Sequence, residues 1–158
     1  MRILGVDPGF GRIGFGIIEK NKSEWKLISY GCIVTSAKET FVDRLNDLHQ
    51  QLTLIIKKFN PSCSAVEDLF FYKNVKTAMK VGEARGVILL TLIQAGLKII
   101  ELTPLQVKQA VTGYGRAEKN QVKKMVELIL REKKLKQDDA VDALAVAIAG
   151  GNCTKLKI

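Results

Sequence analysis

The spacing of hydrophobic positions along this sequence changes between two periods. Over residues 12–20 apolar side chains recur at every second position, which is typical of a β-strand. Over residues 40–59 leucine, isoleucine and phenylalanine recur every three or four positions, as on the buried side of an amphipathic helix. Short apolar runs between the helical stretches predict further strands.

Five strands and five helices are expected from this pattern. The strands span 3–6, 12–20, 24–35, 63–66 and 97–102. The helices span 40–59, 74–95, 104–111, 118–133 and 138–149. Short turns join the first three strands, so these should form an antiparallel meander. The last two strands follow helical crossovers and should run parallel to the first strand.

The expected fold class is therefore α/β, with a five-stranded mixed sheet flanked by helices. A chain of 158 residues is long enough to bury a core, so a single domain over 1–158 is expected. The 47% apolar and 26% charged residues are typical of a folded soluble protein. No apolar run is long enough to span a bilayer and no signal peptide is visible, so a cytoplasmic location is expected.

Charge and cysteine content narrow the range of functions. The chain has 25 Lys and Arg against 16 Asp and Glu, a net charge of +9. Such an excess favours a polyanionic partner, and nucleic acid is the better candidate, although a solvated basic face also explains many basic proteins. The three cysteines are widely spaced and odd in number, which argues against a disulfide framework or a zinc site.

Two acidic residues stand at the tips of neighbouring strands. Asp7 ends the first strand, because Pro8 and Gly9 cannot extend it, and Glu67 ends the fourth. Asp68 must point to the opposite face, since side chains alternate along a strand. The alternatives are that Asp7 belongs to a plain Asp-Pro-Gly turn and that Glu67 is an exposed strand-end acid.

Two further acids, Asp139 and Asp142, share one face of the last predicted helix. Its many alanines would allow the helix to lie close against the sheet and carry these carboxylates to the strand tips. Asp138 stands where a first-turn or capping acid is stabilised by backbone N–H groups, and the doublet leaves the third acid of the cluster open between Asp138 and Asp139.

Four clustered carboxylates predict a metal site. They would repel one another unless a cation lay between them, and oxygen-only ligands suit Mg²⁺ or Mn²⁺. Two such ions about 4 Å apart are typical of phosphodiester hydrolysis. Acidic residues that hold metal, in a basic chain that would hold a phosphate backbone, indicate a nuclease.

Aromatic and basic residues give the candidate DNA contacts. Phe70 and Phe71 lie beside Lys73 and Lys76, a combination suited to stacking on unpaired bases and binding phosphate, although one or two of the rings could be buried packing. Basic residues also border the glycine loop at 112–117. These are Lys108, Arg116 and Lys119.

Several segments together make the chain recognisable. They are ILGVDPGFGRIGFGII, AVEDLFFYKNVKTAMKVGEARG, QVKQAVTGYGRAEKNQV and DDAVDALAVAI. Over nearly its whole length the chain resembles the RuvC family of crossover junction endodeoxyribonucleases, which resolve four-way (Holliday) DNA junctions and have a ribonuclease H-like fold. The resemblance implies a homodimer that nicks two strands of like polarity symmetrically, working with a branch-migration helicase complex of the RuvA and RuvB type.

The resemblance also implies roles for individual residues. Asp7, Glu67, Asp139 and Asp142 correspond to the catalytic, metal-binding carboxylates of the family. Phe70 corresponds to the aromatic residue that contacts bases near the junction centre. Lys108 and Lys119 correspond to basic residues that handle DNA at the site. The apolar helix over 81–93 would supply the dimer interface or belong to the core.

Two other functions are considered. Gly9, Gly11 and Gly14 spell GxGxxG, but a dinucleotide-binding loop needs a helix after the glycines, and the following residues alternate as a strand. A non-catalytic junction-binding protein would have no need of the four carboxylates. A metal-dependent junction nuclease is therefore the expected function.

Overall fold

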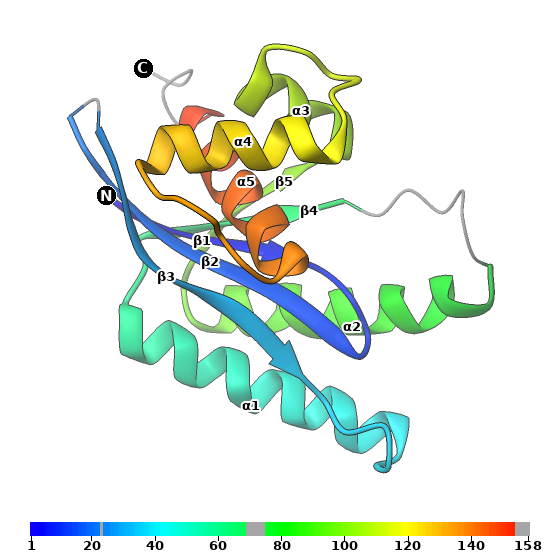
Figure 1. The fold of residues 1–158 in the computed structure, drawn as a ribbon. Coiled ribbons are helices and arrows are strands. Elements are labelled where there is room, and N and C mark those ends of the chain that lie inside the picture. Colours follow the sequence, from blue (N-terminus) through cyan, green and yellow to red (C-terminus); the bar gives the residue numbers. More distant parts are fainter. Residues whose placement is uncertain (23, 69–74, 154–158) are drawn as a thin grey trace.

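A five-stranded mixed sheet lies between two layers of helices (Figure 1). The computed structural model describes residues 1–22, 24–68 and 75–153. The strands are β1 (Arg2–Asp7), β2 (Arg12–Asn21), β3 (Glu24–Val34), β4 (Cys63–Glu67) and β5 (Lys98–Leu102), in the order β3-β2-β1-β4-β5. β1, β2 and β3 pair antiparallel, and β4 and β5 run parallel to β1. The predicted fold class is confirmed.

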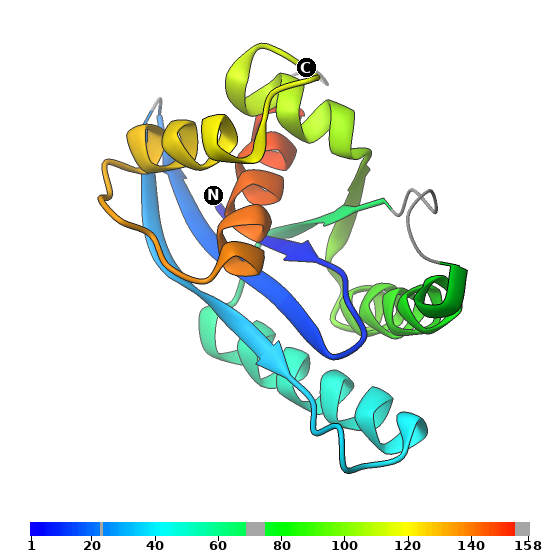
Figure 2. The same cartoon turned by 45° about the vertical axis from the view of Figure 1, so that its right-hand side comes forward.

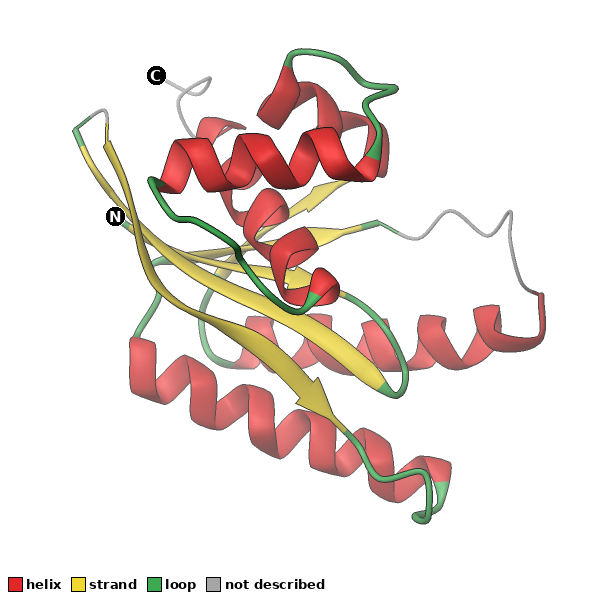
Figure 3. Cartoon of the chain, in the orientation of Figure 1, coloured by secondary structure: helices red, strands yellow, loops and turns green. Residues whose placement is uncertain are grey.

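The helices divide between the two faces of the sheet. They are α1 (Phe41–Phe59), α2 (Val75–Gln94), α3 (Pro104–Thr112), α4 (Lys119–Leu130) and α5 (Asp138–Cys153). α1 and α2 cover one face, and α3, α4 and α5 lie on the other (Figures 2 and 3). No helix in the described ranges is long and apolar enough to cross a bilayer.

Local sequence explains most of the helix ends. Thr40 caps α1 by accepting a hydrogen bond from the backbone N–H of Asp43. Thr103 and Gln106 form a capping box at the start of α3. α4 ends at Leu130, before the predicted 133, because Arg131 adopts a left-handed conformation.

α5 lies unusually close to the sheet. A side chain at Gly5 of β1 would overlap the backbone of Ala143, and one at Gly14 of β2 would overlap the backbone of Asp139. The helix also runs four residues beyond the predicted Ala149, to Cys153. The helix can continue here because residue 151 is a glycine. A Cβ at this position would overlap the ring of Trp25.

α2 has one buried and one exposed face. Ile88 and Leu92 are fully buried in the core between α1, α2 and the sheet. Met79, Leu90 and Ile93 are 74%, 54% and 60% exposed. A Cβ at Gly82 or Gly86 would meet no atom within 4 Å. The two roles considered for this helix, core and interface, therefore fall on different faces.

Candidate active site

The strand tips bring the first two acids together. β1 and β4 pair in parallel with Val6 opposite Val66, so Asp7 and Glu67 follow at the same level. Their side chains are joined by a hydrogen bond. The packing of α5 on β1 and β2 then places its acids over this edge.

All four predicted carboxylates share one site. Carboxylate oxygens of Asp7, Asp139 and Asp142 lie within 4.8 Å of one another, and Glu67 joins them through Asp7. Asp138 instead faces Lys123, with 3.8 Å between Oδ1 and Nζ, and its side chain is 65% exposed. The structure therefore places Asp139, and not Asp138, in the cluster.

Burial and mutual repulsion make these acids hard to ionise together. The pKa of Asp7 is raised well above its usual range, first by burial and then by the carboxylates of Glu67 and Asp142. Burial and the nearby Asp142 raise the pKa of Glu67 to about 7. Burial also raises the pKa of Asp142. Without a cation, the cluster does not favour four negative charges.

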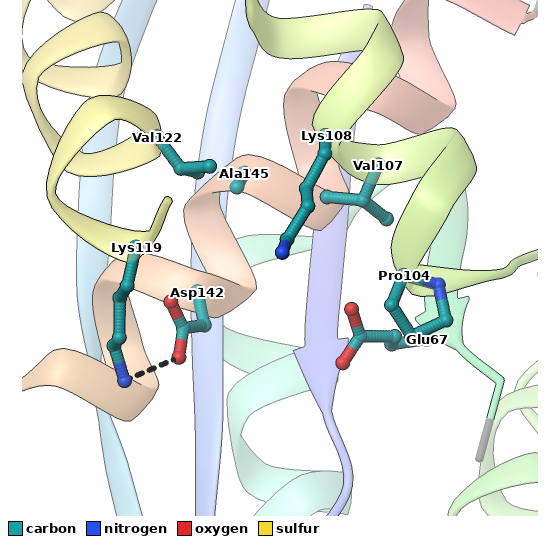
Figure 4. A pocket seen from close by; sticks show the side chains of 8 residues that line it. All are labelled: Glu67, Pro104, Val107, Lys108, Lys119, Val122, Asp142 and Ala145. Atoms are coloured by element: carbon teal, nitrogen blue, oxygen red, sulfur yellow. Dashed lines mark ion pairs between the residues drawn. The ribbon is translucent and has the colours of Figure 1, made fainter. Parts of the chain in front are cut away.

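Three cationic side chains stand around the cluster. Lys119 Nζ lies 3.0 Å from Asp142 Oδ2, and Arg12 Nε lies 2.8 Å from Asp139 Oδ2. Burial would lower the pKa of Lys119, but the ion pair with Asp142 and the other α5 acids raise it. Lys108 points between Asp142 and Glu67 and, with Lys119, lines a cavity of about 210 Å³ (Figure 4).

The other predicted DNA contacts are placed differently. Arg116 is exposed in the loop between α3 and α4 and does not line this cavity. Phe70, Phe71 and Lys73 lie outside the described residues, as does the side chain of Lys76. Their roles stay predictions.

Sequence reasoning missed two arginines at the site, Arg12 and Arg85. From α2, Arg85 donates through Nε to the backbone carbonyl of Glu67 at 3.4 Å. Its guanidinium also pairs with Asp68, at 3.2 Å, and with Glu101. Asp68 does point away from the acidic cluster, as strand alternation predicts. The sequence placed Arg85 only on a helix expected to cover the sheet. It did not determine which residues of that helix would lie beside the end of β4.

A mixed sheet with acidic strand tips, completed by a carboxylate-bearing helix and flanked by lysines, defines a nuclease of the ribonuclease H-like class. The family model described as "Crossover junction endodeoxyribonuclease RuvC" matches residues 3–150. The chain belongs to this RuvC family.

Relatives of the same description match almost end to end. The crossover junction endodeoxyribonuclease RuvC of Halothermothrix orenii is 55% identical over 157 residues, covering 99% of this chain and 95% of the relative. That of Petrotoga mobilis is 53% identical over 153 residues, covering 96% and 94%.

Solved structures agree with this assignment. Thermus thermophilus RuvC in complex with a Holliday junction substrate superposes with a TM-score of 0.92 at 33% identity, covering 99% of this chain and 96% of that one. The yeast mitochondrial Holliday junction resolvase Ydc2 has a TM-score of 0.69 at 16% identity, covering 93% and 76%, and this likeness shows the fold alone. The GxGxxG alternative is not supported, because β2 and not a helix follows Gly9 and Gly11.

Proposed function

We propose that this protein is a Holliday junction resolvase, an endonuclease that hydrolyses one phosphodiester bond in each of two strands, placed symmetrically across a four-way DNA junction. The observation that carries the proposal is the convergence of Asp7, Glu67, Asp139 and Asp142 beside Lys108 and Lys119. The Thermus thermophilus relative solved with a Holliday junction substrate supports the choice of DNA.

The donor set fits a hard divalent cation. Its ligands are carboxylate oxygens alone, and burial together with mutual repulsion raises the pKa values of Asp7 and Glu67, which a bound cation would offset. We propose Mg²⁺, with Mn²⁺ as a substitute, held by the four carboxylates, and two ions per site. When bound, such ions activate a water molecule and stabilise the leaving oxygen.

The lysines of the cavity have separate tasks. Lys119 orients Asp142 through its 3.0 Å ion pair and opposes the rise that burial causes in the pKa of this carboxyl. Lys108 projects into the cavity between Asp142 and Glu67, where its ammonium group can bind a phosphate oxygen of the strand to be cut. Together they offset the repulsion between a phosphate and the acidic cluster.

A homodimer would match the near two-fold symmetry of a four-way junction, and the exposed face of α2 supports this proposal. Met79, Leu90 and Ile93 expose apolar surface there, and Gly82 and Gly86 leave room for a second helix to approach closely. Ile93→Lys should therefore give a folded monomer, with oligomeric state measured by sedimentation and folding by an unchanged circular dichroism spectrum. If the variant is still a dimer, the dimer interface does not include the exposed face of α2.

Three further proposals rest on the family resemblance. Residues 1–158 form one nuclease domain, and the protein works in the cytoplasm beside the chromosomal DNA. Its branch-migration partner is a helicase complex of the RuvA and RuvB type. Affinity measurements with purified partners test the last point directly.

The experiment that tests the function compares a synthetic four-way junction with linear duplex, with and without Mg²⁺. Paired nicks only on the junction and only with metal are expected. A junction that is bound but never cut would instead favour the non-catalytic binding protein.

The variant Asp7→Asn separates catalysis from binding and folding. It should abolish cleavage and leave junction binding largely intact, because DNA affinity rests mainly on phosphate contacts. If folding and binding are lost together, Asp7 is structural.

A further inference from the structure

A cluster of two rings and two cations lies on the α1 and α2 side of the sheet. It consists of Phe10, Phe41, Arg44 and Lys80, and we refer to it as the Phe10 cluster. The two rings meet edge to face, with 6.4 Å between centroids. Lys80 Nζ lies 5.8 Å from the Phe10 centroid and 5.5 Å from that of Phe41. Arg44 Cζ lies 5.2 Å from Phe10.

Arg44 holds the turn between β1 and β2 in place. Its Nε donates to Thr35 Oγ1 at 3.0 Å, and its Nη2 donates to the carbonyl of Phe10 at 3.3 Å. A Cβ at Gly11 would lie 2.8 Å from the same Nη2, so the turn packs directly on the guanidinium. Arg44 therefore fixes the position of the Phe10 ring.

Lys80 is the available cation of the cluster. It is exposed, and within the described ranges it makes no ion pair. Lys119 and Arg12, in contrast, are paired with Asp142 and Asp139. The two rings hold the ammonium group of Lys80 in one place, which lowers the entropy that a phosphate contact would cost.

The cluster is close to the acidic site. Phe10 follows Asp7 by three residues, so their Cα atoms are at most about 11 Å apart. A DNA strand advances about 3.4 Å per nucleotide, so the backbone of Phe10 lies within about three nucleotide steps of that of Asp7. The β1–β2 turn and the N-terminal ends of α1 and α2 lie on one side of the molecule in both ribbon views (Figures 1 and 2).

We propose that the Phe10 cluster is a second DNA-binding surface, in which Lys80 binds a backbone phosphate of the strand that is cut. The cut strand then crosses the sheet edge, with Lys108 and Lys119 on the α5 side and Lys80 on the α2 side. This inference rests on the proposed function, because it needs a nucleic acid strand at the acidic cluster.

The test compares Lys80→Ala with the matched variant Lys58→Ala. Lys58 also lies over a ring, with Nζ 5.2 Å from the Phe59 centroid, but it stands about 26 Å along α1 from Phe41. Binding of a labelled four-way junction is measured by anisotropy in EDTA, from about 50 to about 300 mM salt. Lys80→Ala should lower the salt slope of log K by about 0.9 for each protomer, or about 1.8 for a bound dimer, and the affinity at about 0.1 M salt about eightfold for each protomer. Lys58→Ala should match the unmodified protein, and Lys80→Arg should restore the slope.

Each other outcome has a definite meaning. If Lys80→Ala keeps the full slope, Lys80 does not contact a phosphate and the proposal is wrong. If both alanine variants lose the same amount, net charge explains the loss and the proposal is also wrong. If Lys80→Ala lowers the melting temperature, the salt slope is measured instead on Lys80→Gln and Lys80→Arg, which keep the length of the side chain. The proposal then requires a lower slope for Lys80→Gln and the full slope for Lys80→Arg. If the unmodified protein neither binds nor cuts the junction, the proposed function fails; if it does both, only the Lys80 inference is at stake.

Discussion

Helices α5 and α2 lie on opposite faces of the same sheet but are held in different ways. In α5 almost every residue from Ala140 to Gly151 is buried, and its backbone rests on glycines of β1 and β2. In α2 only one side is buried, and Met79 and Ile93 are 74% and 60% exposed. A helix enclosed on all sides cannot shift, whereas a helix with an open apolar face is suited to a partner.

The difference comes from side-chain alternation in the central strands. Gly5 and Gly14 face α5 and let its backbone approach, whereas Leu4 and Val6 face α1 and α2 and keep those helices at side-chain distance. Asp139 and Asp142, two of the four carboxylates proposed to hold metal, are thus carried by the more enclosed of the two helices. Metal ligation requires that precision, because the oxygen atoms lie within 4.8 Å of one another.

The strongest way to break this arrangement is to fill the space beneath α5. Gly5→Ala would place a methyl group against the backbone of Ala143, and we expect it to cost about 3 kcal/mol or more of unfolding free energy. Gly86→Ala, made in the monomeric Ile93→Lys background, should instead stabilise the chain by up to about 1 kcal/mol, because a Cβ there would meet no atom of the same chain. Urea unfolding of both variants checks the pair. Equal effects on the unfolding free energy would mean that the backbone of α5 does not lie directly against Gly5.

A second variant tests whether the α5 side governs the chemistry. Lys119→Gln removes the partner of Asp142 and should slow junction cleavage about a hundredfold, at unchanged melting temperature. Lys123→Gln, which loses only a 3.8 Å contact to the exposed Asp138, should cleave at the normal rate. Single-turnover cleavage rates of the two variants are compared. An equal fall in rate for both would mean that only the loss of net positive charge matters.

The acidic cluster should also make stability depend on pH. Glu67 has a folded pKa of about 7 against an ordinary value of 4.5, so between these values the folded chain binds more protons than the unfolded chain. The unfolding free energy of the metal-free protein should therefore fall as pH rises through this window, by about 2 kcal/mol between about pH 5 and about pH 8. Urea unfolding in EDTA measures this.

A substitution and added metal should both weaken this dependence. Asp142→Asn removes the charge that, after burial, raises the pKa of Glu67, and saturating Mg²⁺ would neutralise the acids. Asp138→Asn, at an exposed position, is the control and should leave the pH dependence unchanged. If the unfolding free energy of the metal-free protein instead rises with pH over this window, the pKa of Glu67 is not raised in the folded chain.

The smallest expected effect concerns the tie between α2 and the strand tips. Arg85→Lys keeps the charge but loses the fork that reaches Glu67, Asp68 and Glu101 together, and we expect a loss of about 1 kcal/mol. Arg131→Lys, in an exposed pair with Glu24, should change stability by less than about 0.5 kcal/mol. Thermal unfolding compares them, and an unchanged Arg85→Lys protein would show that β-pairing alone fixes the end of β4.

Much of the fold and of the acidic cluster could be predicted from the sequence, because both depend on local pattern. Two-residue and helical periods set the elements, and parallel strands of one sheet necessarily bring Asp7 and Glu67 to the same edge. The choice between Asp138 and Asp139 needed the rotation of α5, which packing on Gly14 determines.

The cationic surroundings were harder to predict. Arg12, Arg85 and the Phe10 cluster join segments distant in the sequence, and no spacing rule relates them. Their positions depend on the register of α1 and α2 against the strand tips, which is a property of tertiary packing.

The acidic cluster has a consequence for the time at which activity appears during synthesis. Asp7 is among the first residues made, whereas Asp139 and Asp142 belong to the last helix. At about 5 to 20 residues per second the ribosome needs roughly 7 to 27 s to go from Asp7 to Asp142. A nascent chain therefore has strands that pair but no complete ligand set, and it can cut DNA only once α5 has been released and has docked.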